Sequence, residues 1–412
     1  MKLWLYVALT VILLGFAGTG AWFKFVYLNS GSLLSPFTNM GIVTPLSEVN
    51  TSPFVVYGFV PYWNLSKTVV QPEITHLSYF SLPITQDGEL DGISNRKATD
   101  SDADISSRRW RSEQLNSVVQ QLRPNQAFTV TLTQFDKMSI ETFLSSPSAQ
   151  ATFQNSLRSF LTNTTRPVAG LNIDIEYAGE ATDQLRANYV SFLQQTRQTV
   201  DTVAISKRQT PQNLSISVFA SAASHHLLWD LPALSSSVDH IVVMAYDFHR
   251  SSSPIAGPVA PMFGAKQNWD NDVVLHLKEF LSQVPAQKVL LGIPFYGYEW
   301  ETTTGDSRSL VFPGTGATAS YGRIQRLLQS TNSAEAADGP ITQGWDEDAL
   351  SPYLIFSKGN RQRVIYYDDA RSIGYKVELV NELRLGGIAI WALGYEDGSR
   401  ELWDAVNEHL VQ

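Results

Sequence analysis

The feature that most limits the possible folds is a series of short apolar runs separated by longer amphipathic segments. Each run is nearly continuous in Val, Ile, Leu and Phe, which is typical of strands covered on both faces. The eight candidate strands are Val55–Val60, Thr75–Phe80, Ala127–Leu132, Gly170–Glu176, Leu214–Ala220, His240–Tyr246, Lys288–Phe295 and Gly386–Trp391. Eight strands with intervening helices predict an α/β fold, a (β/α)8 TIM barrel. A doubly wound open sheet is the main alternative, but no glycine-rich phosphate loop follows any of these strands.

The connection between the seventh and eighth candidate strands is much longer than one helix requires, at about 90 residues. Within it, Tyr353–Phe356 and Arg363–Tyr367 flank a turn at Lys358-Gly359-Asn360. Two apolar runs around such a turn predict a hairpin. We therefore expect a small α/β insertion at about residues 301–370.

The chain begins with a long apolar run. Lys2 is followed by almost uninterrupted apolar side chains from Leu3 to Phe23, and Lys24 ends the run. At a helical rise of about 1.5 Å per residue, the run is long enough to cross a bilayer core. We expect residues 1–24 to be a transmembrane anchor or a signal peptide, with a buried helix of the globular domain as the third alternative.

The next segment, residues 25–53, is expected to be a linker. Glu48 is its one charged side chain, among Ser, Thr, Asn, Gly and Pro. The folded domain should then cover residues 54–412. An anchor or a signal would place this domain outside the cytoplasm, either tethered to the membrane at the cell surface or secreted.

Charge and cysteine content exclude several classes of function. The formal net charge is −9, which disfavours a surface for nucleic acid. The chain has no cysteine, so disulfides, thiolate metal sites and cysteine nucleophiles are absent from it. Its seven histidines show no metal-binding spacing. We expect no metal and no cofactor.

The fourth candidate strand carries the polar residues that point most clearly to catalysis. Asn172, Asp174 and Glu176 alternate with Leu and Ile, so they share one face of the strand and point into the barrel. Neighbours on one face are about 6.5–7 Å apart. At that distance Asp174 can raise the pKa of Glu176 and prepare it as a general acid. The structural alternative is a buried polar network that only sets the register of the strand.

Other strand ends add a phenol, a carboxylate and aromatic rings. Tyr246 and Asp247 end the sixth candidate strand, and Tyr246 can donate a hydrogen bond to a substrate carbonyl. Aromatic faces beside carboxylates suit a sugar ring, which has apolar C–H faces and a rim of hydroxyls. The candidate substrate-binding residues are Asn172, Asp247, Trp391, Tyr298 and Tyr62.

Together these motifs resemble glycoside hydrolase family 18, the chitinase-type family. The likeness covers about residues 55–405 and is most similar to the bacterial subgroup of spore-cortex and spore-germination glucosaminidases. The family's DGxxDxDxE motif, in loose form, is matched by Gly170, Asp174 and Glu176, and its MxYD motif by Met244, Tyr246 and Asp247. Its GIPxYG motif is matched by Gly292–Gly297, and its last-strand tryptophan by Trp391.

The resemblance implies retaining, substrate-assisted hydrolysis of β-1,4 bonds next to N-acetylglucosamine. Glu176 would protonate the glycosidic oxygen and later activate water, while the acetamido carbonyl of the sugar attacks the anomeric carbon. Asp174 would hold the acetamido N–H, Tyr246 would bind its carbonyl and Trp391 would form the floor of that subsite. The partner would be a polysaccharide or oligosaccharide that contains N-acetylglucosamine, either peptidoglycan, chitin or an N-glycan core. The bacterial subgroup and the N-terminal segment favour peptidoglycan.

Two alternatives remain at this point. Glu176 and Glu299 lie at the ends of the fourth and seventh candidate strands and would form a two-carboxylate retaining site if they lay about 5–5.5 Å apart. A non-catalytic sugar-binding protein can also be built on the same barrel. Family lectins typically lose the acid at the position of Glu176, which this chain keeps.

Overall fold

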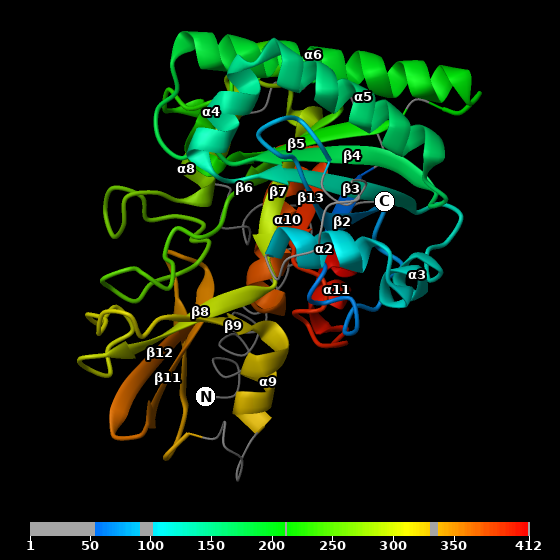
Figure 1. Cartoon of the computed structure of the whole chain (residues 1–412). Helices are drawn as coiled ribbons and strands as arrows, with labels where there is room; N and C mark the ends of the chain where they lie inside the picture. Colours follow the sequence, from blue (N-terminus) through cyan, green and yellow to red (C-terminus); the bar gives the residue numbers. More distant parts are fainter. Residues whose placement is uncertain (1–53, 91–101, 211, 330–336, 411–412) are drawn as a thin grey trace, which may run out of the picture. The chain divides into compact units, whose positions relative to one another are not determined.

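The computed structural model describes residues 54–90, 102–210, 212–329 and 337–410. Eight parallel strands close into a barrel in the order β1-β13-β7-β6-β5-β4-β3-β2 (Figure 1). The predicted parallel barrel with helices is therefore confirmed. Its strands are β1 (Val55–Pro61), β2 (His76–Pro83), β3 (Ala127–Gln134), β4 (Val168–Ile175), β5 (Asn213–Phe219), β6 (His240–Met244), β7 (Val289–Pro294) and β13 (Gly387–Trp391).

Helices surround the barrel and begin at residues that suit helix caps. The longest, α6, starts after Thr182, whose hydroxyl accepts a hydrogen bond from the Leu185 N–H. It buries Leu185, Tyr189, Phe192 and Leu193 on one face, so the apolar residues at helical spacing form the side that packs against the rest of the domain. The helices around the barrel are α2 (Asp102–Trp110), α3 (Glu113–Val119), α4 (Lys137–Ser145), α5 (Pro147–Asn163), α6 (Asp183–Ser206), α7 (Leu231–Ser235), α8 (Val273–Leu281), α10 (Ala370–Glu382) and α11 (Glu401–His409).

A second sheet of five antiparallel strands is formed by the chain between β7 and β13. Its order is β10-β11-β12-β8-β9. The sheet begins at Tyr296, directly after β7, and not at the expected residue 301 or so. Its elements are β8 (Tyr296–Thr302), β9 (Ala317–Ser320), α9 (Tyr321–Gln329), β10 (Thr342–Asp346), β11 (Ser351–Lys358) and β12 (Arg361–Tyr366).

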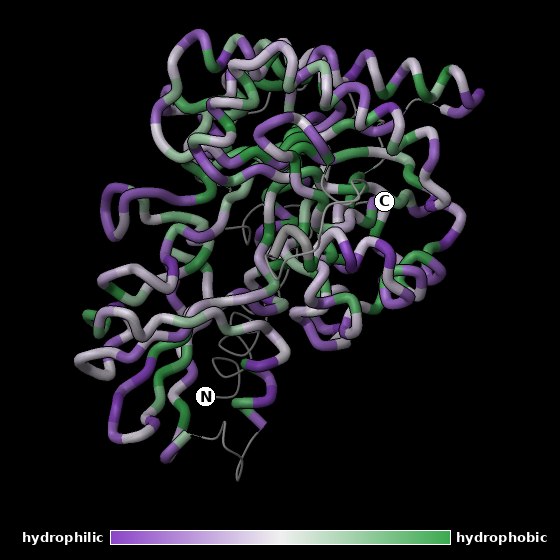
Figure 2. Tube along the Cα trace, viewed as in Figure 1, coloured by the Kyte–Doolittle hydropathy of each residue, from purple (hydrophilic) through white to green (hydrophobic). Residues whose placement is uncertain are grey.

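One part of the barrel interior consists of polar side chains that bind one another, and another part is an apolar cluster that includes Phe59, Val242 and Leu290. Tyr57 and Thr129 are joined by a 2.8 Å hydrogen bond between hydroxyls, and Ser78 and Thr131 by another of 2.8 Å. The alternate residues of the strands are apolar and face the helices, and Figure 2 shows the barrel strands as the greenest part of the chain. Because these small polar groups are paired, they can be buried without a large desolvation cost.

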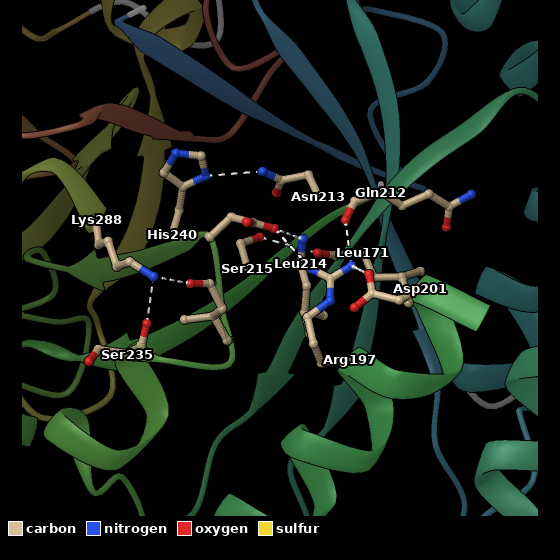
Figure 3. A network of polar contacts seen from close by, with 12 residues as sticks. Leu171, Arg197, Asp201, Gln212, Asn213, Leu214, Ser215, Ser235, His240 and Lys288 are labelled. Atoms are coloured by element: carbon tan, nitrogen blue, oxygen red, sulfur yellow. Dashed lines mark hydrogen bonds and ion pairs between the residues drawn. The ribbon is translucent and has the colours of Figure 1, made fainter. Parts of the chain in front are cut away.

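The amino ends of the strands are tied together on the side of the barrel opposite to the strands' carboxyl ends. Arg197 of α6 donates to the Asp201 carboxylate and to the Gln212 carbonyl just before β5 (Figure 3). Lys288, just before β7, donates to the carbonyls of Ser235 and Val238. These charged groups fix how three neighbouring strands enter the barrel.

The N-terminal predictions concern residues that lie outside the described part of the chain. These are the anchor or signal at 1–24 and the linker at 25–53. Among the residues that are described, no helix combines the length and the apolar character needed to span a bilayer.

A buried ion pair joins α10 to the loop before it. The Lys376 ammonium lies 2.8 Å from the Asp368 carboxylate, and both side chains are almost fully buried. We predict that Asp368→Ala lowers the free energy of unfolding by about 3–5 kcal/mol, because it leaves the Lys376 charge without a partner. Urea unfolding measures this. As a control, Asp404→Ala breaks an exposed pair with Arg400 and should cost less than about 1 kcal/mol. Equal costs for both would contradict the prediction.

Two histidines at the base of the barrel should make stability depend on pH. The His76 ring stacks on Tyr57 and lies edge-on to His240, with ring centroids 5.6 and 6.4 Å apart. Burial, and secondly the charge of His240, lowers the pKa of His76 to about 4. The unfolded chain takes up this proton near pH 6.5, so stability should decrease as the pH falls from about 6.5 to about 4.

The test compares unfolding of His76→Gln with the wild type across that pH range. The variant should lose less stability on acidification, with a difference in slope of at most about 1.4 kcal/mol per pH unit. The exposed His225 provides the control, and His225→Gln should follow the wild-type curve. A wild-type slope retained in His76→Gln would show that this ring is not the group that titrates.

Candidate active site

A pocket of about 650 Å³ opens at the carboxyl ends of the barrel strands. Residues from the carboxyl-terminal parts of the eight barrel strands, or from the segments directly after them, line it. This is the face on which barrel enzymes carry their chemistry. The strand-end residues that line it are Phe59, Phe80, Phe135, Asp174, Glu176, Phe219, Met244, Tyr246, Asp247, Tyr296 and Trp391.

Asp174 lies deep in this pocket, one residue before the end of β4. It is paired in register with Thr133 of β3, and its side chain is only 4% exposed. Within the described residues, its Oδ1 atom is buried without a hydrogen-bond partner. Burial and then the neighbouring charge of Glu176 raise its pKa well above the usual range. A buried acceptor without a partner is costly, and such an atom is expected to receive a donor from a ligand.

Glu176 follows directly after β4, whose last residue is Ile175. Its N–H donates a 3.0 Å hydrogen bond to the Gln134 carbonyl, so the backbone still follows β3 at this point. Burial and then Asp247 raise the pKa of Glu176 to about 7, against the opposing effect of Arg250. A carboxyl group with this pKa is about half protonated at neutral pH, as a general acid requires.

Tyr246 and Asp247 lie beyond β6, which ends at Met244, two residues earlier than the sequence predicts. Asp247 has φ = 60°, in the left-handed region, so the chain turns sharply here. Burial raises the pKa of the Tyr246 phenol well above its usual value, and Asp174 is the next largest cause. The phenol therefore keeps its proton and can donate a hydrogen bond into the pocket.

Asp247 is held by two tyrosines of β8. Tyr296 and Tyr298 both donate hydrogen bonds to its Oδ1 atom, the second at 3.1 Å. Tyr298 is 8% exposed and is not among the residues that line the pocket. Its hydroxyl positions Asp247, and the predicted substrate contact of Tyr298 stays a prediction.

Trp391 forms one aromatic wall of the pocket with Phe80. Their ring centroids are 4.6 Å apart and the rings are nearly perpendicular. Phe135, after β3, stacks on the other side of Phe80 and is half exposed. Tyr62 packs edge-on against Trp63 at 4.8 Å and is not among the residues that line the pocket, so its substrate contact stays a prediction. Trp63, whose ring is 6.3 Å from that of Trp391, stands between Tyr62 and this wall.

Asn172 serves the barrel interior. It is fully buried, its amide donates to the Ser215 hydroxyl at 3.0 Å, and its carbonyl accepts from the Ser217 hydroxyl at 3.0 Å. The prediction that Asn172 binds substrate is therefore corrected. Both ends of its amide are occupied by β5, one layer below the pocket.

Glu299 is separated from the pocket by its own ion pairs. It lies in the second sheet on β8, 3% exposed, between the guanidinium groups of Arg323 and Arg363. It does not line the pocket that contains Glu176. A carboxylate held by two arginines is a poor nucleophile, so this geometry argues against the two-carboxylate alternative.

Comparison with known proteins identifies the family. Residues 55–396 match the profile of Glycosyl hydrolases family 18. The chain belongs to glycosyl hydrolase family 18. Its barrel is therefore a glycosidase domain, and the motifs on β4, β6, β7 and β13 lie where the resemblance places them.

Relatives of this family 18 chain come from plants, animals and bacteria. A class V chitinase of Arabidopsis thaliana is 28% identical over 283 residues, which is 66% of this chain and 70% of that protein. A putative sporulation-specific glycosylase of Bacillus subtilis, YdhD, is 27% identical over 265 residues, 62% of this chain. The match covers 54% of the Bacillus protein, so this chain spans about half of it.

Solved structures of other proteins have the same barrel fold as this chain. The structure of a family 18 N-acetylglucosaminidase from Paenibacillus barengoltzii superimposes with a TM-score of 0.68. The match covers 87% of this chain and all of that chain, at 19% identity. At this identity the likeness establishes the shared barrel fold.

The pocket also contains residues that sequence reasoning missed. Arg250 and Asn271 line it from the connection between β6 and α8, His276 from α8 itself, and Phe135 from the loop after β3. Arg250 follows Asp247 by three residues, so a charged side chain just past a strand end was a usable signal. Asn271 and His276 carried none, because only the folding of that connection brings them back to the strand ends. Within the described residues, no group of three or more metal-binding side chains is present.

The pKa of Glu176 provides a test of this geometry. We predict that Asp247→Asn lowers it, because a negative charge that disfavours ionised Glu176 is removed. Difference infrared titration should find a carboxyl group near pH 7 in the wild type, absent in Glu176→Gln, and at lower pH in Asp247→Asn. Tyr298→Phe is the matched control, since it removes a hydrogen bond to Asp247 but no charge. An unchanged or higher pKa in Asp247→Asn would refute the assignment.

Proposed function

We propose that this protein hydrolyses β-1,4 bonds next to N-acetylglucosamine in a cell-surface glycan, peptidoglycan or chitin-type, with retention and with assistance from the substrate. The observation that carries the proposal is the buried Asp174 Oδ1 atom without a partner, beside Glu176 and Tyr246 in one pocket. An acetamido group offers one N–H donor and one carbonyl acceptor. Asp174 supplies the matching acceptor and Tyr246 the matching donor.

The first step forms an oxazolinium ion. Glu176 gives its proton to the glycosidic oxygen, the bond from the anomeric carbon to that oxygen breaks, and the acetamido carbonyl oxygen bonds to the anomeric carbon. Asp174 accepts the hydrogen bond of the acetamido N–H, whose positive charge grows in this step. Tyr246 orients the carbonyl oxygen for attack, which lowers the entropic part of the barrier.

The second step releases the sugar with its original configuration. Glu176, now ionised, takes a proton from water while the water oxygen attacks the anomeric carbon and the oxazolinium ring opens. Two inversions give net retention, without a covalent bond to the protein. Trp391, against Phe80, offers the apolar face on which the sugar ring packs.

The relatives support the class of substrate. The Arabidopsis relative is named a chitinase, and the Paenibacillus structure is titled an N-acetylglucosaminidase. The Bacillus relative is named a sporulation-specific glycosylase. N-acetylglucosamine is common to chitin and to peptidoglycan, and the bacterial relatives favour the latter.

The location of the protein is part of the proposal. We infer that the apolar run Leu3–Phe23 exports the chain and anchors the catalytic domain at the outer side of the membrane, or is cleaved to release it. A tether of this kind would hold the active site close to the cell's own wall.

The proposal predicts which variants and substrates lose cleavage. Full-length protein and its Glu176→Gln and Asp174→Asn variants are incubated with N-acetylated chito-oligosaccharides and with purified peptidoglycan, and products are followed by mass spectrometry. Each variant should lose about 10²–10⁴-fold in rate, as expected for a general acid or a group that stabilises charge in the transition state. The first product detected by NMR should be the β-anomer.

The alternatives give different outcomes. An oligosaccharide without the acetyl group should not be cleaved, whereas a two-carboxylate enzyme would still cleave it and would depend on Glu299. Glu299→Gln tests that dependence directly. Binding of the sugars without cleavage by any form would identify a lectin and reject the proposed hydrolysis.

A further inference from the structure

Arg250 is a cation on the wall of an otherwise acidic pocket. It lines the pocket together with Asp174, Glu176 and Asp247. Its backbone is fixed on both sides: its N–H donates to the Ser253 hydroxyl at 2.9 Å, and its carbonyl accepts from the Trp300 indole N–H at 3.0 Å. The second sheet therefore holds Arg250 in place at the pocket.

The guanidinium group is anchored by one nitrogen only. Its Nε–H donates to the Asp247 carbonyl at 3.2 Å. In the described part of the chain, no carboxylate forms an ion pair with it, and the side chain is exposed. By contrast, Arg308, Arg323 and Arg363 in or near the second sheet are all paired with carboxylates of the chain. The four terminal N–H groups of Arg250 are thus free to bind a ligand.

The order of the strands divides the pocket into two halves. Trp391, Phe59, Phe80 and Phe135 come from β13, β1, β2 and β3, which are consecutive neighbours in the barrel. The other half comes from β4, β5, β6 and the segments after them, and it holds the polar side chains of the pocket beside apolar ones such as Phe219, Met244 and Phe248. It includes Glu176, Ser217, Ser221, Asn271 and Arg250. A sugar that packs on Trp391 therefore has the aromatic half around it, and its neighbour beyond Glu176 faces the half that holds the polar side chains.

We propose that Arg250 binds a carboxylate on the sugar residue next to N-acetylglucosamine and so makes the enzyme prefer an acidic glycan to a neutral one. The inference rests on the proposed function and specifies its substrate class. The lactyl carboxylate of N-acetylmuramic acid in peptidoglycan is a group of this kind, and chitin has a hydroxyl in its place. A guanidinium fork matches a carboxylate in two hydrogen bonds and is always charged.

The charge balance of the protein explains why a local cation is needed. A net charge of −9 repels an acidic polymer at long range, and three carboxyl residues line the pocket itself. A single unpaired arginine offsets this repulsion at the subsite where the carboxylate lies. The carboxylate-bearing sugar is then the leaving group, and the new reducing end is N-acetylglucosamine.

The test uses full-length protein and three tetrasaccharides. These are chitotetraose, a tetrasaccharide of alternating N-acetylglucosamine and N-acetylmuramic acid, and the same compound with its carboxylates converted to amides. Arg250→Gln should lower kcat/KM for the acidic compound about tenfold relative to that for chitotetraose, as expected for an exposed hydrogen bond to a charged group. With the wild type, the amidated compound should lose a similar factor. Arg250→Lys should restore part of the preference.

The ratio of kcat/KM for the acidic compound to that for chitotetraose separates the loss of a carboxylate contact from other effects of Arg250→Gln. Arg250 lowers the pKa of Glu176, so its loss shifts the pH profile for every substrate and leaves the ratio between substrates unchanged. Arg158→Gln, on the exposed face of α5, removes the same charge far from the pocket lining and should leave the ratio at its wild-type value. Hydrolysis in H₂¹⁸O should place the label on N-acetylglucosamine.

The experiment distinguishes failure of the Arg250 contact from failure of the proposed function. An equal loss for acidic and neutral compounds in Arg250→Gln would overturn the carboxylate contact and leave the proposed function standing. If the wild type cleaves none of the three, the proposed function fails. In that case, binding of the acidic and the amidated tetrasaccharide is measured for Glu176→Gln and for the double variant that also carries Arg250→Gln. The Arg250 contact predicts that the ratio of the two binding constants falls in the double variant. A ratio that does not depend on Arg250 would reject it.

Discussion

The arrangement of this protein depends on two carboxyl groups placed on one face of one buried strand. Burial removes most of the hydration of Asp174 and Glu176 and raises the pKa of both; the charge of Glu176 raises the pKa of Asp174 further, and the charge of Asp247 does the same for Glu176. A strand that carried them into an apolar core would be strongly destabilised. The barrel tolerates them because they lie where β4 reaches its open end, next to a pocket. The unfavourable desolvation keeps a proton available near neutral pH, and that proton is what glycoside chemistry uses.

Below the pocket, β4 buries another polar side chain without a further desolvation penalty. Asn172 occupies the position two residues earlier on the same face, yet its amide is fully bound by Ser215 and Ser217. Tyr57, Thr129, Ser78 and Thr131 continue this polar packing toward the base. Two residues further along this face, the Asp174 Oδ1 atom is buried without a hydrogen-bond partner among the described residues. This atom lies at the pocket and is left for a ligand.

The second sheet is part of the active site and not an appendage to it. Tyr296 and Tyr298 of β8 hold Asp247, whose charge raises the pKa of Glu176, and Trp300 holds the backbone of Arg250. The same sheet encloses Glu299 between two arginines and so keeps a third carboxylate away from the reaction. The strand β8 therefore positions the charge of Asp247, fixes the backbone of Arg250, and carries Glu299, which Arg323 of α9 and Arg363 of β12 neutralise.

The sequence by itself determined the barrel and the catalytic face of β4. Apolar runs and period-two alternation depend only on the residues within each strand, so the shared face of Asp174 and Glu176 could be predicted without a structure. The strand ends near Glu176 and Tyr246 were placed one and two residues too far, because only pairing with neighbouring strands decides where a strand stops. Tertiary structure alone decided that Asn172 is bound by Ser215 and Ser217, that Tyr298 binds Asp247, and that Asn271 and His276 reach the pocket. These outcomes depend on contacts between segments far apart in the chain, for which local patterns contain no signal.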